Sequence, residues 1–494
     1  MADSAPPLPP QQQQHDEQER ISSLLDTDLY KLTMQCAILK YFPDADVTYF
    51  LTNRTPDMKF TRQAYNWLAK QVNELANISL TAEELEFLKR RCPYLNNAYL
   101  RYLSTFRFKP SEQIEISFTP VQDTWSESDI GDVKLKITGL WVETILYEIP
   151  LLALTSMAYF KWCDRDWDYE GQEESAFQKG VALLQGACTF SEFGTRRRRD
   201  YHTQELVMRG LMRAVEKSKQ EGWKGIFSGT SNVHFAMVHD VHPVGTVAHE
   251  WYMGIAAITN DYENANELAS RYWIGCFGEG VLGVALTDTF GTPEFLKAFS
   301  QPIPSYTTAA EGSSCMLAST GDTPTGTLAE TEAPITAPIP TGSNQSTKTY
   351  AEVFKGVRQD SGDPAHFVKM MRDFYDQHRI EGTKTIVFSD SLNIERCFEY
   401  KEIAEKAGFW PAFGVGTFLT NDFKQRSTGK KSVPLNIVIK IASAGGRSAV
   451  KISDNLGKNT GDPGTVAEVK QRLGYVEREW RNGDETQRWG KKGE

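Results

Sequence analysis

The chain has 494 residues and a formal net charge of −10, with 40% hydrophobic and 24% charged residues, which is ordinary for a globular protein. The negative balance argues against nucleic acid as the main partner, because phosphate contacts need a positive surface. It leaves room for a small anionic substrate held by a few arginines.

The N-terminal residues 1–20 are rich in Pro and Gln and have no apolar core, which predicts a disordered tail and not a signal peptide. The most apolar stretch, 140–159, carries Glu143 and Glu148. It therefore does not predict a membrane span, which needs roughly 20 uncharged apolar residues. Seven cysteines without a CxxC pair favour free thiols in a reducing compartment. We expect a cytoplasmic protein, with the nucleus as an additional location.

Residues 21–155 predict an α+β domain. Helical periodicity runs through residues 64–76 and 82–91, whereas polar and apolar residues alternate in 114–118 and 133–137. Alternation with a period of two is typical of half-exposed strands.

Residues 156–430 follow a different pattern, in which short apolar runs end in small or polar residues and helix-like stretches follow. The runs are 225–227, 244–247, 282–286, 354–357, 384–388 and 411–413. Repeated buried strands of this kind predict parallel β/α units in an α/β barrel, whose strand ends converge on one face as the active site. A doubly wound open sheet is the alternative.

Two further segments complete the predicted organisation. Residues 303–349 are rich in Thr, Pro, Ser, Gly and Ala, which predicts a low-complexity insertion in preference to an active-site lid. Alternation returns in residues 435–440, so we expect the C-terminal segment 431–494 to rejoin the first domain. Its last residues, from 487 on, predict a solvated tail.

Four arginines, 196–199, follow a Gly-Thr pair and precede a predicted helix over 201–215. A helix N-terminus favours anions, and arginine forks bind phosphate or carboxylate. The run therefore predicts an anion clamp, with a solvated basic face or a nuclear signal as alternatives. A GxGxxG match at 278–283 precedes a predicted strand instead of following one, so we discard it as a dinucleotide site.

The segment Arg358-Gln-Asp360-Ser-Gly-Asp363-Pro364 is the most informative motif. Asp363 and Pro364 are typical of the N-cap and first position of a helix, here one that runs to about His378. Two carboxylates beside an arginine suit a ribose diol or a diphosphate with its Mg²⁺. Asp360 and Asp363 are therefore candidate Mg²⁺ ligands, with an ordinary capped loop as the alternative.

Two turns follow later predicted strands. One is Ser389-Asp390-Ser391, which precedes a helix, and the other is Gly414-Val-Gly416-Thr417. Backbone N–H groups in such turns bind phosphate oxygens, so the two turns together indicate a phosphorylated ligand.

His249 lies at the end of a predicted strand, beside Glu250, and Asp288 ends the next predicted strand. A carboxylate partner would orient the imidazole and raise its nucleophilicity. No group of His and Cys has zinc spacing, which argues against a zinc role.

Taken together, these motifs resemble those of the nicotinate phosphoribosyltransferase family. The segments that carry the resemblance are 25–34, 192–197, 229–232, 245–251, 286–289, 358–364, 387–390, 413–417 and 451–458. The resemblance implies an irregular, funnel-like α/β barrel of the type II phosphoribosyltransferase kind, with an α+β domain formed by the two ends of the chain. It also implies synthesis of nicotinate mononucleotide from nicotinate and phosphoribosyl diphosphate, with ATP coupled through a phosphohistidine. An insertion before residue 358 is similar to the fungal branch.

The resemblance further implies roles for single residues. His249 would be the phosphorylated histidine and Asp288 would orient it, and with Glu250 they form the catalytic candidates. The substrate-binding candidates are Tyr30 and Phe193 around the pyridine ring, Thr246 and Arg358 near nicotinate, Arg196 at the anionic groups, Asp360 and Asp363 at the ribose and Mg²⁺, and Asp390, Gly414, Gly416 and Thr417 at the 5-phosphate.

Ser231 bears on the choice between nicotinate and nicotinamide. Nicotinamide-using relatives carry Asp at this place, and a carboxylate there would repel nicotinate, so Ser231 favours the acid. Nicotinamide phosphoribosyl transfer, a non-catalytic ligand-binding relative, and a phosphosugar aldolase or hydrolase are the alternatives. The intact His249, Arg358 and Asp360 argue against a silent relative. We expect a monomer or a homodimer in which Tyr30 reaches the neighbouring site.

Overall fold

The computed structural model describes residues 20–304, 345–455 and 459–476. Almost all of the predicted tail 1–20, most of the predicted insertion 303–349 and the predicted tail from residue 487 lie outside the described residues. Two short strands lie at the two ends of the predicted insertion, β8 (Pro302–Pro304) and β9 (Gln345–Thr349), and they pair antiparallel. The chain therefore leaves and re-enters the described structure at nearly the same place.

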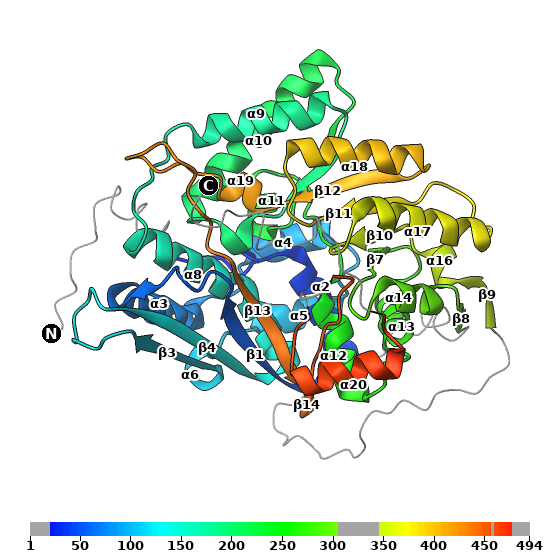
Figure 1. Ribbon diagram of the computed structural model, residues 1–494, viewed down its shortest axis with the longest axis horizontal. Coiled ribbons are helices and arrows are strands. Elements are labelled where there is room, and N and C mark those ends of the chain that lie inside the picture. The colour runs from blue at the N-terminus through cyan, green and yellow to red at the C-terminus, as the bar shows by residue number, and fades with distance from the viewer. Residues whose placement is uncertain (1–19, 305–344, 456–458, 477–494) are drawn as a thin grey trace, which may run out of the picture.

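The first sheet is antiparallel and has the order β14-β13-β1-β4-β2, with β3 paired to β4. Its strands are β1 (Asp46–Asn53), β2 (Phe60–Thr61), β3 (Ile114–Pro120), β4 (Ile130–Leu140), β13 (Ile437–Ala444) and β14 (Arg447–Ser448). The predicted strands at 114–118 and 133–137 are confirmed within β3 and β4. Because β13 pairs with β1, the C-terminal part of the chain returns to the sheet of the N-terminal part (Figure 1).

Helices make up most of the rest of this first part of the chain. They are α2 (Leu29–Tyr41), α3 (Arg62–Glu74), α4 (Ala82–Arg91), α5 (Asn97–Thr105), α6 (Pro110–Gln113), α7 (Trp141–Thr144) and α8 (Glu148–Trp162). Of these, α3, α6, α7 and α8 pack on the sheet. The predicted helix at 82–91 is confirmed at both ends. Thr81 and Glu84 form a capping box that fixes its start, since each side chain satisfies a backbone N–H of the other.

The second sheet is parallel and has the order β6-β5-β12-β11-β10-β7. Its strands are β5 (Thr189–Glu192), β6 (Ile226–Thr230), β7 (Val284–Leu286), β10 (Gly356–Gln359), β11 (Thr385–Phe388) and β12 (Trp410–Val415). Each strand pairs with the strands of this sheet that precede and follow it in the chain, and β12, the last, pairs with β5, the first. Within the described residues, the exception is that β6 and β7 do not pair with each other. The sheet is therefore an α/β barrel that is open along one seam, as the irregular barrel of the sequence analysis predicts.

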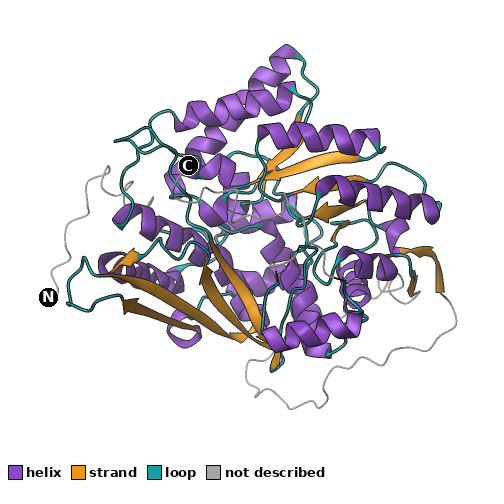
Figure 2. Cartoon of the chain, in the orientation of Figure 1, coloured by secondary structure: helices purple, strands orange, loops and turns teal. Residues whose placement is uncertain are grey.

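Helices follow the barrel strands on the outside (Figure 2). They are α9 (Gln172–Gln185), α10 (Tyr201–Glu221), α14 (Thr292–Phe299), α16 (Tyr350–Val353), α17 (Pro364–Gln377), α18 (Ile394–Lys406) and α19 (Thr417–Thr420). Between β6 and β7 the chain forms α11 (Val233–Val238), α12 (His249–Thr259) and α13 (Ala265–Phe277). The GxGxxG match lies between α13 and β7, which confirms that it is not a dinucleotide turn.

The predicted strand at 244–247 is wrong. The segment makes a single bridge from Pro243 to Thr230 and then leaves the sheet. Gly245 lies so close to α2 that a Cβ there would be 3.1 Å from the backbone nitrogen of Tyr30. A residue without a Cβ permits this approach, and His249 consequently begins α12 instead of ending a strand.

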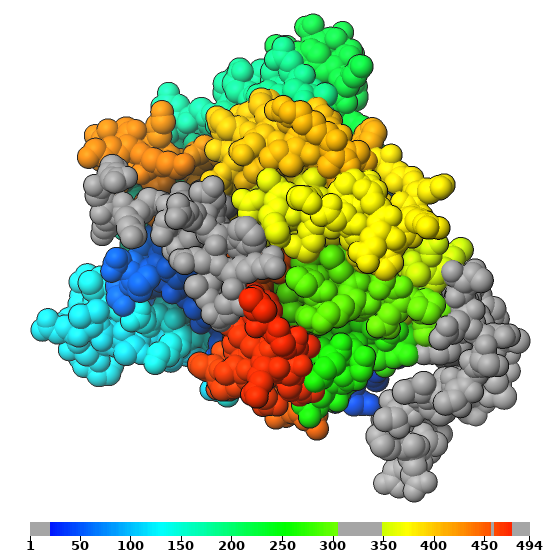
Figure 3. Space-filling view, turned by 45° about the vertical axis from the view of Figure 1, so that its right-hand side comes forward, coloured from blue at the N-terminus to red at the C-terminus, as the bar shows by residue number. Residues whose placement is uncertain are grey.

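The last helix, α20 (Pro463–Leu473), lies on the surface against the part of the chain that contains α12 to α14 (Figure 3). There Arg472 pairs with Glu263 at 2.6 Å. No helix among the described residues is both long and apolar enough to cross a bilayer.

Candidate functional site

Loops at the carboxyl ends of the barrel strands enclose a cavity of about 200 Å³ together with β13. This is the edge where parallel barrels place their active sites. The sequence-predicted residues that line it are Phe193, Arg196, His249, Arg358, Asp360, Asp390, Gly414, Gly416 and Thr417. Arg197, which belongs to the predicted anion clamp, also lines it, as do Arg54, Lys440 and Lys451, for which the sequence predicted no site role. We call this space the main cavity.

A second cavity of about 120 Å³ adjoins the main cavity and shares Arg196, His249, Arg358 and Asp360 with it. Tyr30 lines this side cavity, whereas Phe193 lines only the main cavity. Within one chain, the two rings therefore do not enclose the same space, and the predicted sandwich would need Tyr30 of a second copy.

His249 is held through both ring nitrogens. Its Nδ1 lies 3.0 Å from the hydroxyl of Thr289, and its Nε2 lies 3.0 Å from Asp360, 3.7 Å from Asp288 and 2.8 Å from the ammonium of Lys451. Burial and then the charge of Lys451 lower the pKa of His249, although the two carboxylates oppose this. The imidazole thus lies beside two carboxylates and one ammonium group.

Glu250 is not the carboxylate partner of His249. Its side chain accepts hydrogen bonds from the Tyr49 hydroxyl at 2.6 Å and Trp141 Nε1 at 2.8 Å, and it forms an ion pair with Lys31. Successive residues of a helix point about 100° apart, so Glu250 points away from the partners of His249 and lines the side cavity beside Tyr30. The carboxylates near His249 are those of Asp360 and of Asp288, which the resemblance gives as the residue that orients it.

Arg358 connects three of the loops. Its guanidinium donates to Ser389 at 2.8 Å, to Thr246 at 3.0 Å and to Asp360 at 2.8 Å. Burial alone would raise the pKa of Asp360, but the charges of Arg358, His249 and Lys451 hold it well below its usual range. Asp360 is therefore a carboxylate at neutral pH.

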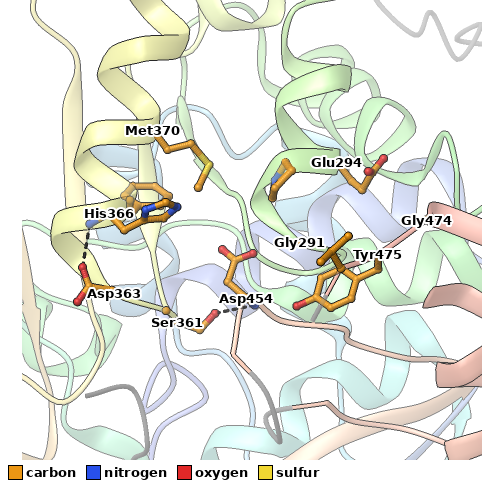
Figure 4. A pocket seen from close by; sticks show the side chains of 13 residues that line it. Gly291, Glu294, Ser361, Asp363, His366, Met370, Asp454, Gly474 and Tyr475 are labelled. Atoms are coloured by element: carbon orange, nitrogen blue, oxygen red, sulfur yellow. Dashed lines mark hydrogen bonds between the residues drawn. The ribbon is translucent and has the colours of Figure 1, made fainter. Parts of the chain in front are cut away.

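Asp363 does not join Asp360, which corrects the predicted pair of Mg²⁺ ligands. Gly362, with φ +79°, turns the chain between them, and Asp363 accepts a 2.8 Å hydrogen bond from the backbone of His366. That N-cap role is confirmed. Figure 4 shows Asp363 and His366 at a separate cavity, where Asp454 lies on the other wall.

The residues therefore do not fit a protein-held Mg²⁺ between Asp360 and Asp363. His249, Asp288 and Asp360 do bring ligand atoms within 4.8 Å of one another. Lys451 already serves as their cation, since its Nζ also lies 3.0 Å from Asp288.

The four arginines divide into two pairs. Arg196 and Arg197 line the main cavity, where the predicted anion clamp applies to them. Arg198 is buried against Asp26, and the guanidinium of Arg199 is buried against aromatic rings, 4.0 Å from the ring centre of Phe423. Only the first pair is available to a ligand.

Ser231 is buried and lines neither cavity. Its hydroxyl donates to Asp28 Oδ1 at 2.8 Å, and burial raises the pKa of Asp28, against the opposing charge of Arg196. Asp28 immediately precedes α2, the helix that carries Tyr30, so Ser231 is linked to the start of this helix through the carboxylate.

Gly414 has a packing reason to be glycine. A Cβ at Gly414 would lie 2.6 Å from the ring of Phe193, and one at Gly416 would lie 3.0 Å from the carbonyl oxygen of Phe193. The turn after β12 therefore fixes Phe193 on the wall of the main cavity, in addition to presenting its backbone beside Thr417.

Two family models match most of the chain. The nicotinate phosphoribosyltransferase (NAPRTase) N-terminal domain matches residues 25–156, and the nicotinate phosphoribosyltransferase family model matches 188–309 and 336–477. A protein of Schizosaccharomyces pombe named for this activity is 44% identical over 455 residues, which are 92% of this chain and 98% of that protein. A nicotinate phosphoribosyltransferase of Saccharomyces cerevisiae is 43% identical over 474 residues, which are 95% of this chain and 99% of that protein. A crystal structure of that name from S. cerevisiae has a TM-score of 0.80 and covers 92% of this chain and 99% of its own, at 43% identity.

Proposed function

The chain belongs to the nicotinate phosphoribosyltransferase family, and we propose that it joins nicotinate to 5-phosphoribosyl 1-diphosphate. The products are nicotinate mononucleotide and diphosphate, so the enzyme is a glycosyltransferase of NAD synthesis by salvage. Both fungal relatives reported above fit the branch that the insertion before residue 358 predicts.

The composition of the main cavity carries the proposal. Its cationic side chains are Arg54, Arg196, Arg197, Arg358, Lys440 and Lys451, against two carboxylates, Asp360 and Asp390. A chain with a net charge of −10 has thus gathered positive charge at one place, as a substrate with a phosphate, a diphosphate and a carboxylate requires.

The chemistry needs positioning more than proton transfer. The ring nitrogen of nicotinate is already a nucleophile, and it attacks C1 of the ribose as diphosphate departs. The protein lowers the barrier by holding the two reactants in line and by stabilising the negative charge that builds up on the leaving group. Phe193 offers an aromatic face to the pyridine ring, and Arg196 and Arg358 offer charge to its carboxylate.

ATP coupling through His249 is part of the proposal. The imidazole is 19% exposed, lines both cavities and has two carboxylates beside Nε2, which suits a nucleophile that becomes positively charged on phosphorylation. We propose that Mg²⁺ enters with the phosphates of the substrates, because the chain's own acids are held by Arg358, His249 and Lys451.

The test is direct. The full chain is incubated with radiolabelled nicotinate, phosphoribosyl diphosphate and Mg²⁺, with and without ATP, and nicotinamide is run in parallel. We expect labelled nicotinate mononucleotide, formed faster with ATP. Absence of the mononucleotide would refute the proposal, and faster use of nicotinamide would reverse the choice of base. A His249→Ala variant that kept full stimulation by ATP would refute the phosphohistidine.

We propose a cytoplasmic enzyme that is a monomer or a homodimer. Because Tyr30 and Phe193 line different cavities within one chain, sedimentation of the active enzyme decides whether a second copy is needed.

A further inference from the structure

Lys451 reaches His249 from the C-terminal part of the chain, and its side chain is only 7% exposed. Its backbone exchanges two hydrogen bonds with Thr460, at 2.9 Å each, and the next residue donates from its backbone to the carbonyl oxygen of Thr289 at 2.7 Å. The Thr289 hydroxyl faces Nδ1 of the same histidine. The groups that meet the two ring nitrogens are thus fixed to one another through the backbone.

The donors and acceptors that each side chain offers determine how His249 is held. A neutral imidazole has one N–H donor and one lone pair, and an ammonium can only donate. At 2.8 Å from Lys451, Nε2 must therefore present its lone pair to the ammonium. The proton then lies on Nδ1, where the Thr289 hydroxyl accepts it. The opposite arrangement, with a protonated ring donating to Asp360, would place two cations 2.8 Å apart.

We propose that Lys451 covers the Nε2 lone pair of His249 while no nucleotide is bound, and moves to the transferred phosphoryl group when His249 is phosphorylated. The second half rests on the ATP coupling proposed above. Lys451 lines the main cavity, so its ammonium can turn from the ring toward a phosphate held there without leaving its own wall.

In the proposed step, a phosphoryl group passes from ATP to Nε2 of His249. The lone pair of Nε2 forms the new bond to the γ-phosphorus of ATP, and the bond from that phosphorus to the bridging oxygen breaks. Its electron pair leaves with ADP. Nδ1 keeps its proton toward Thr289, and Lys451 keeps all of its protons while its ammonium passes from Nε2 to a phosphoryl oxygen. The ring becomes a cation.

An orphaned oxygen supports this sequence. Asp288 is 1% exposed, and its Oδ1 has no hydrogen-bond partner in the described chain. Its other oxygen accepts from Ser361 at 2.5 Å and faces Lys451. A buried acceptor without a donor is rare and calls for an explanation. Here Oδ1 lies 3.7 Å from Nε2, where it meets the positive charge that phosphorylation creates.

The test uses Lys451→Met and needs two measurements. Without the ammonium, Nε2 and the carboxylates of Asp288 and Asp360 form three ligands for a metal. Titration with Zn²⁺ alone is expected to give one bound equivalent for Lys451→Met, and none for the wild type or for Lys451→Met/His249→Ala. Lys440→Met is the matched control, because Lys440 also lines the main cavity but donates to Thr460; it is expected to bind no Zn²⁺.

The second measurement follows transfer of ³²P from the γ-position of ATP to His249. We expect Lys451→Met to slow it by about 100-fold, the usual effect of removing one charged donor from a transition state, and Lys451→Arg to restore part of the rate. Equal Zn²⁺ uptake by wild type and Lys451→Met, or labelling of Lys451→Met at the wild-type rate, would overturn the inference. If the wild type itself is not labelled, the ATP coupling and the movement of Lys451 both fail, and the Zn²⁺ titration still decides whether Lys451 covers the lone pair.

Discussion

Arg198 donates two hydrogen bonds to the carboxylate of Asp26, at 2.8 and 2.6 Å, and neither side chain is more than 2% exposed. The two residues are 172 positions apart. Asp26 lies just before α2, the helix that carries Tyr30, and Arg198 lies just after Phe193 and Arg196. This ion pair therefore joins the segment that carries Tyr30 of the side cavity to the segment that carries Phe193 of the main cavity. Arg198 thus has a structural role, although the run of arginines to which it belongs resembles a ligand site.

Replacing Arg198 by leucine is expected to destabilise the protein by about 3–5 kcal/mol, because it leaves the Asp26 carboxylate buried without its partner. Urea unfolding at neutral pH measures this. Arg196→Ala is the control from the same run, since that side chain is 44% exposed and its loss should change stability by under about 1 kcal/mol. Equal urea midpoints for Arg198→Leu and the wild type would contradict the assignment.

Arg196→Ala is instead expected to weaken substrate binding. A charge-assisted hydrogen bond to a substrate anion contributes about 1.5–3 kcal/mol, so KM for nicotinate or phosphoribosyl diphosphate should rise by roughly 10- to 100-fold with a smaller change in kcat. Arg209→Ala serves as the control, since Arg209 lies on the outer helix α10 and pairs with Glu173 at 2.8 Å. Unchanged KM values for both substrates would remove Arg196 from the site.

The sequence predicted those helices and strands correctly whose signals lie within a few neighbouring residues. The capping box of α4 and the alternation of β3 and β4 act over a few residues, and the sequence predicts all three. It missed β5, because four residues that end in a buried glutamate carry little apolar pattern. It also took 244–247 for a strand, because the contact that removes this segment from the sheet is with α2, far away in the chain.

The candidate site shows more clearly that contacts between distant segments cannot be predicted from local patterns. Motifs identified His249, Arg358 and Asp360, and the resemblance gave Asp288, which lies 3.7 Å from Nε2, as the residue that orients His249. The sequence did not predict the closer partners of Nε2. The contacts that count come from Asp360, 111 positions away, and from Lys451, 202 positions away. Which carboxylate or ammonium meets a histidine depends on how the barrel and the C-terminal segment pack, and no spacing within a motif encodes that.

Ser231→Asp is expected to lower kcat/KM for nicotinate by at least about tenfold. The new carboxylate would face Asp28, which now accepts the Ser231 hydroxyl, and two buried like charges at hydrogen-bond distance cannot both stay ionised at low cost. Parallel assays with nicotinate and nicotinamide measure the effect. The conservative variant Ser231→Thr keeps the hydroxyl and should retain most of the activity with nicotinate. Full nicotinate activity in Ser231→Asp would show that position 231 does not discriminate between the bases.

Asp454 should make the protein less stable as the pH rises from 5 to 7.5. Burial and the nearby Asp288 raise the pKa of Asp454 from 3.8 to about 6, although it accepts hydrogen bonds from Thr292 at 2.7 and 2.5 Å. Because the folded pKa is the higher one, the folded chain binds more protons than the unfolded chain between these values. The stabilisation is complete below pH 3.8 and is lost as the pH passes 6.

Asp454→Asn removes this titration and keeps groups that can hydrogen-bond Thr292. Relative to the wild type, the variant should therefore gain about 1.4 kcal/mol of stability between pH 5 and pH 7.5, which corresponds to roughly one pKa unit over that interval. Urea unfolding of both proteins at several pH values measures the difference. Asp462→Asn is the control: hydrogen bonds from Thr465 lower the pKa of that N-cap carboxylate, so its effect should not vary above pH 5. Stability curves for Asp454→Asn and wild type that run parallel from pH 5 to 7.5 would show that Asp454 is ionised in the folded protein throughout this range.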